Sequence, residues 1–166
     1  FITIEGIEGS GKTTIAKRLE GWMRERGRPT FRTREPGGTE IGETLRELIL
    51  DADRPLSVQA ELLLIEAARA QIMEEIIIPR LALGETVILD RHCDSTIAYQ
   101  GYGRGVDMNL VEQINRFVCR DRTPDITLIL DVDVKTGLQR AQKVKERTNF
   151  NDRFESEALE FMQRVR

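Results

Sequence analysis

Short apolar runs and longer stretches with helical spacing alternate along this chain of 166 residues. The apolar, β-branched runs at residues 2–4, 30–33, 86–89 and 126–130 are typical of short buried strands. Between them, apolar positions recur three and four residues apart, as they do in amphipathic helices. This alternation predicts an α/β fold with a mainly parallel sheet.

The same pattern predicts four helices. The first begins at Lys12 and ends near Gly27, a residue type common at helix C-caps. The others are predicted over residues 41–49, from Ser57 to about Ile78, and from about Asn109 to Arg120. Residues 101–105 contain three glycines and are predicted to form a turn before the last of these helices.

The helix that begins at Ser57 has apolar residues around an unusually wide arc. One stripe contains Val58, Leu62, Ile65 and Ile72, and further apolar residues spread around the cylinder, namely Leu63, Leu64, Ala67 and Ala70. A helix of this kind is buried on more than one side. We therefore expect one side to meet the core and the other to meet a second subunit in a homodimer.

Arg69 interrupts this apolar helix on the face that carries Ile65, four residues earlier. Two interpretations stay open at this point. The side chain could extend along the surface to reach water, as long cationic side chains do, or it could bind a ligand.

Composition and charge limit the possible functions. The net charge of −3, with 40% hydrophobic and 32% charged residues, fits an ordinary soluble protein and disfavours broad nucleic-acid binding. Cys93 and Cys119 form no paired motif, and one histidine makes a zinc site improbable. No apolar run is long enough for a membrane span, and the N-terminus lacks the layout of a signal peptide. We expect a single cytoplasmic domain, residues 1–166, with reduced thiols and no initiator Met.

The stretch from Gly6 to Thr13 carries the most specific chemistry. Gly6-x-x-x-x-Gly11-Lys12-Thr13 lies between a strand and a helix, where backbone N–H groups and the helix dipole can hold an anion. Lys12 can reach the outer phosphates of a nucleotide, and the Thr13 hydroxyl can ligate Mg²⁺. A flexible turn is the alternative, but the order of strand, loop and helix favours nucleoside-triphosphate binding.

Acidic residues follow two of the predicted strands. Asp90, at the end of the third strand, and Asp131, after the fourth, are both candidates for the carboxylate that binds Mg²⁺ and its water molecules. Ligands of parallel sheets bind beyond the carboxyl ends of the strands. We therefore expect the strand ends at Glu5, Arg34 and Asp90 to converge on one site.

The polar, basic stretch from Arg140 to Arg153 could be a solvated loop or a lid. It carries Lys143, Lys145, Arg147 and Arg153, whereas residues 7–10 of the phosphate loop contain no basic residue. Phosphoryl transfer needs neutralisation of the charge on the transferred group. A basic lid over about residues 141–153 would supply it and exclude water.

Several motifs together resemble thymidylate kinase. They are the phosphate loop with Glu5 and Glu8, Thr33-Arg34-Glu35-Pro36-Gly37-Gly38-Thr39, Asp90-Arg91-His92, Ser95, Ala98-Tyr99-Gln100-Gly101, Pro124-Asp125 and Asp152-Arg153-x-Glu155. The resemblance runs from Phe1 to Arg166. It implies a P-loop NTPase three-layer fold, with a parallel sheet flanked by helices and a short basic lid. It also implies transfer of the γ-phosphoryl group of ATP to dTMP with Mg²⁺.

The resemblance implies a role for each matching residue. The catalytic residues would be Lys12, Asp90, Arg91 and Arg153, with Thr13 and Asp90 at the metal. ATP would contact Gly6, Ile7, Glu8, Gly9, Ser10, Gly11, Lys12, Thr13, Thr14 and Arg140. The dTMP contacts would be Glu8, Arg34, Ile65, Arg69, Arg91, Ser95, Thr96, Tyr99 and Gln100, with Arg34 and Arg91 on the phosphate and Arg69 on thymine O4.

The chain departs from the family pattern at two places. Ile65 stands where the family usually stacks a phenylalanine on thymine. The family also continues beyond the position of Arg166 into a final strand, an adenine-contacting loop and a helix, so we expect part of the family fold to be absent.

Three rival functions make different demands on the sequence. A kinase for another nucleoside monophosphate would not need the Arg34 to Gly38 and Tyr99 to Gly101 segments together. A GTP-dependent switch would need an Asn-Lys-x-Asp motif to recognise guanine, and the chain does not contain one. A binding protein without catalysis would lack Lys12, Asp90 or Arg91, and all three are present.

Overall fold

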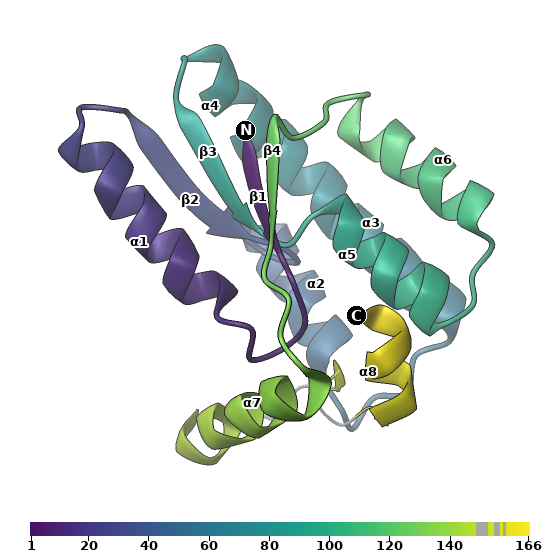
Figure 1. Ribbon diagram of the computed structural model, residues 1–166. Helices are drawn as coiled ribbons and strands as arrows, with labels where there is room; N and C mark the ends of the chain where they lie inside the picture. The colour runs from purple at the N-terminus through teal and green to yellow at the C-terminus, as the bar shows by residue number, and fades with distance from the viewer. Residues whose placement is uncertain (149–152, 155–156, 158) are drawn as a thin grey trace.

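The computed structural model describes residues 1–148, 153–154, 157 and 159–166 of the chain (Figure 1). Its sheet contains β1 (Ile2–Glu5), β2 (Thr30–Arg34), β3 (Thr86–Asp90) and β4 (Ile126–Ile129) in the order β2-β3-β1-β4. All three strand pairs are parallel. The predicted α/β class and its four strands are therefore confirmed.

The strand register brings the expected functional residues to one edge of the sheet. Asp90 pairs with Ile4 on one side and with Arg34 on the other, and Glu5 ends the strand that begins at Ile2. The central strands, β1 and β3, are buried apart from their first residues, Ile2 and Thr86, because helices cover both faces of the sheet. This rigid centre fixes the positions of the polar residues at the strand ends.

Helices cover the two faces of the sheet, with α1 on one side and α3, α5 and α6 on the other (Figure 1). The α-helices are α1 (Lys12–Glu25), α2 (Glu40–Leu50), α3 (Val58–Ile72), α4 (Ile78–Ala82), α5 (Cys93–Thr96), α6 (Met108–Cys119), α7 (Val134–Thr148) and α8 (Leu159–Val165). Two π-helical segments, η1 (Met73–Ile77) and η2 (Ile97–Gly103), continue α3 and α5. No helix in the described ranges has both the length and the apolar character needed to cross a bilayer.

The predicted helix starts are confirmed. The α1 helix begins at Lys12, and the Ser57 hydroxyl accepts a hydrogen bond from the Ala60 N–H at the start of α3. The long helix continues past the predicted end at Ile78 to Ala82, through the π-helical segment. Periodicity did not reveal this segment, because its apolar residues keep the helical spacing.

The predicted turn over residues 101–105 is wrong in its first half. Gly101 and Gly103 lie in η2, and a Cβ atom at Gly103 would come 2.7 Å from the Phe161 ring on α8. The glycine is therefore explained by close helix packing rather than by chain reversal.

The predicted lid, about residues 141–153, overlaps α7, to which residues 141–148 belong. Val134, Gly137 and Ala141 share one helix face and are buried. This face packs against the phosphate loop, where the carbonyl oxygen of Gly137 approaches Gly9. The side chains of Lys145 and Arg147, and all of residues 149–152, lie outside the described residues.

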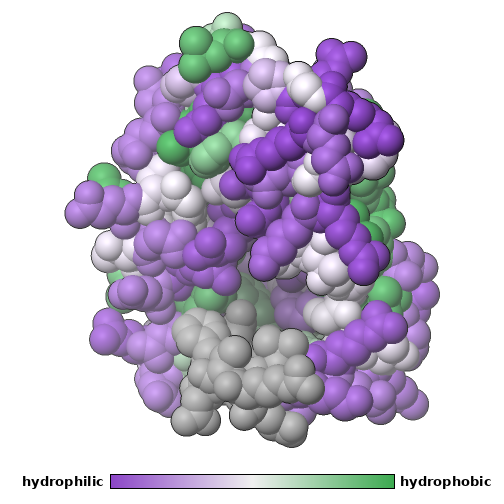
Figure 2. Space-filling model, turned by 90° about the vertical axis from the view of Figure 1, so that its left-hand side faces the viewer, coloured by the Kyte–Doolittle hydropathy of each residue, from purple (hydrophilic) through white to green (hydrophobic). Residues whose placement is uncertain are grey.

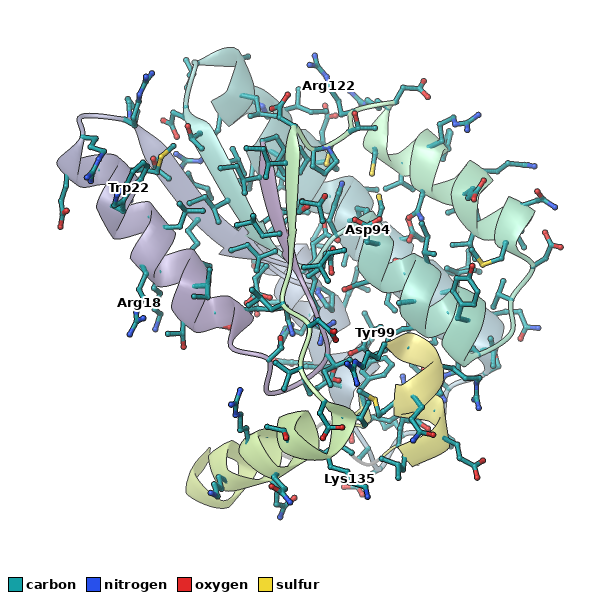
Figure 3. The ribbon with its side chains drawn as sticks, in the orientation of Figure 1. Arg18, Trp22, Asp94, Tyr99, Arg122 and Lys135 are labelled. Atoms are coloured by element: carbon teal, nitrogen blue, oxygen red, sulfur yellow. The ribbon has the colours of Figure 1, made fainter. Side chains whose placement is uncertain are left out.

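Most of the face on the α1 side is hydrophilic (Figure 2). Arg18 and Trp22 lie on the outer surface of α1, whereas Tyr99 points into the interior between η2 and α8 (Figure 3).

Candidate active site

The phosphate loop lies between β1 and α1. Gly9 has a φ angle of 69°, and a Cβ atom there would lie 2.0 Å from the Gly137 carbonyl oxygen. No other residue type fits this position, because both the backbone conformation and the space exclude a side chain. This close contact with α7 fixes the middle of the loop, which leads to the N-terminus of α1, where backbone N–H groups can bind phosphate.

Lys12 folds back over this loop. Its Nζ donates hydrogen bonds of 2.8 Å to the carbonyl oxygens of Gly6 and Ile7. Burial lowers the pKa of Lys12 to about 7, and the positive charge of Arg91 acts in the same direction. The Lys12 amine is therefore held with little solvent around it, and a bound anion would favour its charged, ammonium form.

Thr13 and Asp90 form the oxygen pair that the sequence associates with Mg²⁺. The Thr13 hydroxyl donates to Asp90 Oδ2 over 2.7 Å. Asp131, the second candidate carboxylate, instead accepts from Arg166, with 2.6 Å between Nε and Oδ1. The structure thus places Asp90, rather than Asp131, beside the threonine of the loop.

Arg91 is held in a strained conformation by its neighbours. Its φ angle is 71°, which is uncommon for a residue with a side chain. Its Nη2 donates to Glu8 Oε1 over 2.7 Å and to the Tyr99 hydroxyl over 3.1 Å, while Nη1 donates to Ser95 Oγ over 3.1 Å. Burial raises the pKa of Tyr99 well above its usual range, so its hydroxyl keeps the proton that it donates to Glu8.

Arg69 lies at the centre of a buried polar network. Its side chain is 1% exposed, which excludes the surface interpretation of the sequence. Its Nε donates to Glu35 Oε2 over 2.7 Å, and its Nη1 donates to Glu66, to Thr96 Oγ1 and to Asn115 Oδ1. Within the part of the chain that the structure describes, none of these hydrogen bonds involves the second terminal nitrogen, Nη2.

These groups surround one cavity of about 300 Å³, which we call the main cavity. The predicted residues that line it are Glu8, Gly9, Lys12, Thr13, Arg34, Ile65, Arg69, Asp90, Arg91, Ser95, Thr96, Tyr99 and Gln100. Arg34 stands at its rim and donates two hydrogen bonds, of 3.0 and 2.8 Å, to the Glu43 carboxylate. The expected convergence of the strand ends at Arg34 and Asp90 is confirmed.

Sequence reasoning missed six residues of the main cavity: Glu35, Pro36, Arg46, Leu50, Ala141 and Phe154. The first two belong to the recognised segment around Arg34, so that motif could have indicated them. Nothing in the local pattern distinguishes Ala141 or Phe154, because both arrive from distant parts of the chain.

Other predicted residues lie elsewhere. Arg140 is exposed on α7, and Ser10, Gly11 and Thr14 lie in the loop and the first turn of α1. Arg153 is half-buried beside Glu61, with 3.2 Å between its Nη2 and Glu61 Oε2. Its backbone N–H donates to the Leu50 carbonyl oxygen.

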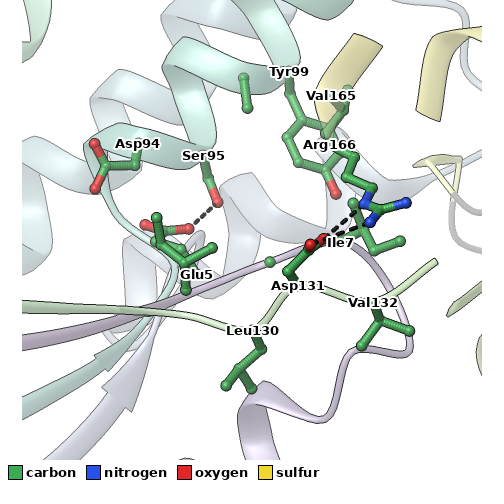
Figure 4. Close-up of a pocket in the computed structure, with 13 residues that line it drawn as sticks. Glu5, Ile7, Asp94, Ser95, Tyr99, Leu130, Asp131, Val132, Val165 and Arg166 are labelled. Carbon is green, nitrogen blue, oxygen red and sulfur yellow. Dashed lines mark hydrogen bonds and ion pairs between the residues drawn. The ribbon is translucent and has the colours of Figure 1, made fainter. Parts of the chain in front are cut away.

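A second cavity, of about 160 Å³, lies beside the first (Figure 4). Gly6 and Ile7 line it together with Glu5, which accepts a 2.6 Å hydrogen bond from Ser95 Oγ, and with the Asp131–Arg166 ion pair. Burial raises the pKa of Glu5. The predicted convergence of Glu5 with the other strand ends thus holds at the backbone, although its side chain faces this second cavity.

The chain is similar to known proteins over almost its whole length. The family model described as thymidylate kinase matches residues 4–166. The chain belongs to the thymidylate kinase family. Members of this family are nucleoside monophosphate kinases, which transfer a phosphoryl group.

Individual thymidylate kinases are similar over the same range. The thymidylate kinase of Carboxydothermus hydrogenoformans is 49% identical over 166 residues, which cover all of this chain and 80% of that protein. That of Halothermothrix orenii is 48% identical with the same coverage. The crystal structure of thymidylate kinase from Ehrlichia chaffeensis superposes with a TM-score of 0.76 at 41% identity, covering 91% of this chain and 83% of that one.

Proposed function

We propose that this chain transfers the γ-phosphoryl group of ATP to dTMP, giving dTDP and ADP, in the main cavity. The observation that carries the proposal is the convergence on that cavity of Lys12, the Thr13–Asp90 pair and the Arg91 cluster. A phosphate loop, oxygen ligands for a cation and fixed arginines are the parts that phosphoryl transfer needs. They occur here in a chain of the thymidylate kinase family.

Lys12 and the loop bind the phosphates of ATP. In the free protein, Nζ is held by two loop carbonyl oxygens, and it moves to the phosphates when ATP binds. Its positive charge then lies where negative charge grows during transfer, in a site that is already largely dry. Arg140 and Arg153 are proposed as further ATP-side contacts, at adenine and at the transferred group.

Thr13 and Asp90 fit a magnesium ion. A hydroxyl and a carboxylate oxygen 2.7 Å apart are both hard donors, as Mg²⁺ requires. Bound there, Mg²⁺ would neutralise phosphate charge. Asp90 also anchors the end of β3, so it presents its carboxylate from a rigid position.

Arg34 and Arg91 bind the phosphate of dTMP. Arg91 is positioned before substrate arrives, because Glu8, Tyr99 and Ser95 hold its guanidinium group. This pre-organisation reduces the entropy lost when the two substrates are aligned. Glu8 and Tyr99 are in turn placed beside the sugar.

Arg69, Thr96, Gln100 and Ile65 surround the base. Glu35 and Glu66 fix the Arg69 side chain, and we assign its Nη2 as the donor to thymine O4. An arginine has no acceptor for the amino group that cytosine carries at the same place. Ile65 adds apolar contact, and the only aromatic rings that line the cavity, among the described residues, belong to Tyr99 and Phe154.

We further propose that the chain folds as one domain, acts in the cytoplasm, where ATP is available, and forms a homodimer through α3. Nucleic acid is not proposed as a partner, because the net charge is negative.

The proposed reaction is tested by ADP release with ATP, Mg²⁺ and a panel of dTMP, dUMP, dCMP and AMP. We expect dTMP and dUMP to be used in preference to dCMP and AMP. Lys12→Met should lower kcat by at least ~10²-fold, the order found when one charge-stabilising group is removed. Preference for another nucleotide would refute the substrate, and near-normal turnover of Lys12→Met would refute the role of the loop.

A further inference from the structure

Two cysteines that lie far apart in the sequence meet in the fold. Cys93 begins α5 and Cys119 ends α6, and their sulfur atoms are 3.2 Å apart. Both are free cysteines. A disulfide requires a separation of about 2.05 Å, so the sulfur atoms need to approach by about 1.2 Å.

We propose that Cys93 and Cys119 are a modification site at which a hydroperoxide forms a reversible disulfide within the chain. The Cys93 sulfur attacks a peroxide oxygen and breaks the O–O bond, which yields a sulfenic acid and water. The Cys119 sulfur then attacks Cys93 and releases a second water. In total, two thiols and H₂O₂ become one disulfide and two water molecules.

Burial sets the order of these steps. Cys119 is 3% exposed, whereas Cys93 is only partly buried, so an oxidant reaches Cys93 first. The hydrogen bond to Cys119, together with burial, raises the pKa of Cys93. Since the thiolate is the reactive form, oxidation should be slow compared with that of a dedicated peroxide sensor.

Distances favour a covalent bond over a metal site. The ligand atoms of His92, Cys93 and Cys119 lie within 4.8 Å of one another and could in principle bind zinc. Tetrahedral zinc, with Zn–S bonds of about 2.3 Å, would hold two sulfurs about 3.8 Å apart, well beyond the observed 3.2 Å.

The disulfide would act on the active site through α5. Cys93 lies two residues after Arg91, and Ser95 on the same helix accepts a hydrogen bond from the Arg91 guanidinium group. In a close-packed interior, the 1.2 Å approach is shared between rotation of the two cysteine side chains and movement of α5 and α6. Because a misplacement of about 1 Å can cost as much as ~10²-fold in rate, we expect kcat/KM for dTMP to fall by up to that factor. This consequence rests on the proposed function.

The test treats the reduced full chain with hydrogen peroxide, once with a chelator and once with added zinc and no chelator. We expect mass spectrometry of the intact chain to show the loss of two hydrogens, and a linked Cys93–Cys119 peptide after digestion. Dithiothreitol should restore both the mass and the kcat/KM for dTMP. Cys93→Ala and Cys119→Ala are the matched controls and should form no link.

Three results would overturn the proposed site: a sulfenic or sulfinic acid on Cys93 without a link, a link between two chains, or stoichiometric zinc that protects both thiols until a chelator is added. A disulfide that leaves kcat/KM unchanged would overturn its effect on the kinase. The mass measurement does not depend on turnover. A chain that forms the disulfide but never phosphorylates dTMP would therefore contradict the proposed function and not the modification site.

Discussion

Arg91 combines an unfavourable backbone conformation with fixed side-chain partners. A positive φ angle at a residue other than glycine costs about 1 kcal/mol or more and persists only where the surroundings enforce it. Here the N–H of Arg91 donates to the Ile4 carbonyl oxygen, and Glu8, Tyr99 and Ser95 hold the guanidinium group. These contacts hold the Arg91 guanidinium group in the main cavity before any substrate binds.

Lys12 should take up a proton when ATP binds. Its pKa in the free protein is about 7, so above pH 7 much of the population is neutral. The phosphates of ATP favour the charged form and raise this pKa. Proton uptake should therefore be near zero well below pH 7 and increase as the pH rises above 7, approaching one proton per site.

Calorimetric titration of ATP in two buffers of different ionisation enthalpy measures this uptake. Lys12→Met should lose the pH-dependent part, and Lys17→Met, on the exposed face of α1, should keep it. Equal heats in both buffers at pH 8 for the parent would contradict the lowered pKa of Lys12.

Among the elements, the segment around Arg153 tests whether an arginine outside the cavity takes part in transfer. Arg153 pairs with Glu61, which also accepts hydrogen bonds from Arg104 and Gln100. If Arg153 moves to the phosphates only in the transition state, Arg153→Ala should lower kcat and kcat/KM together, by ~10²-fold. Steady-state kinetics with varied ATP measure both values.

Lys135→Ala is the control, because this cation is exposed at the start of α7. A raised KM for ATP with an unchanged kcat would mean that Arg153 only binds ATP. The proposed role in transfer would then be withdrawn.

Helices and strands could be predicted where a local sequence pattern determines them. They were missed where contacts with other parts of the chain determine them. The strands follow from apolar runs, the start of α1 from the phosphate-loop motif, and the start of α3 from its capping residue, Ser57. By contrast, η2 runs through Gly101 and Gly103, where Met108, at the start of the next helix, and Phe161, from the distant α8, pack against these glycines. The buried face of α7 was not predicted either, because basic residues dominate the sequence of this helix. The face is buried only because it packs against the phosphate loop.

At the scale of the whole molecule, α3 leaves one apolar stripe exposed. Leu63, which is 60% exposed, lies on this stripe with Ala67 and Ala70, while Leu62, Ile65 and Ile72 are buried. We expect a homodimer to cover the stripe, and Leu63→Glu to place two buried charges at its interface. Light scattering at micromolar concentration should give twice the chain mass for the parent and less for the variant.

Leu83→Glu is the matched control, since this leucine is 78% exposed beyond the end of α4 and away from the stripe. A parent that remains monomeric at micromolar concentration would exclude the proposed dimer.

The sequence could predict most of the main cavity, because its residues come from motifs at strand ends that a parallel sheet necessarily brings together. It could not predict most partners of Arg69. Glu66 precedes it by three residues on α3, a spacing that allows contact, but Glu35, Thr96 and Asn115 meet it from three other segments, and no spacing in the chain reveals that encounter. The Cys93–Cys119 contact was missed for the same reason.

The central claim is that Arg69 reads the base of dTMP in the main cavity. Arg69→Ala would leave two buried carboxylates without their cation and destabilise the fold, so Arg69→Lys is the better variant. It keeps the charge but loses the planar group that carries Nη2. Arg116→Lys, on an exposed side chain of α6, is the control.

The decisive measurement is the ratio of kcat/KM for dTMP to that for dCMP in the parent and in these two variants. We expect the parent and Arg116→Lys to prefer dTMP, and Arg69→Lys to lose ~10–10²-fold of that preference, the worth of one hydrogen bond to a charged group. An unchanged ratio in a folded Arg69→Lys protein, or a parent that does not prefer dTMP, would contradict the claim.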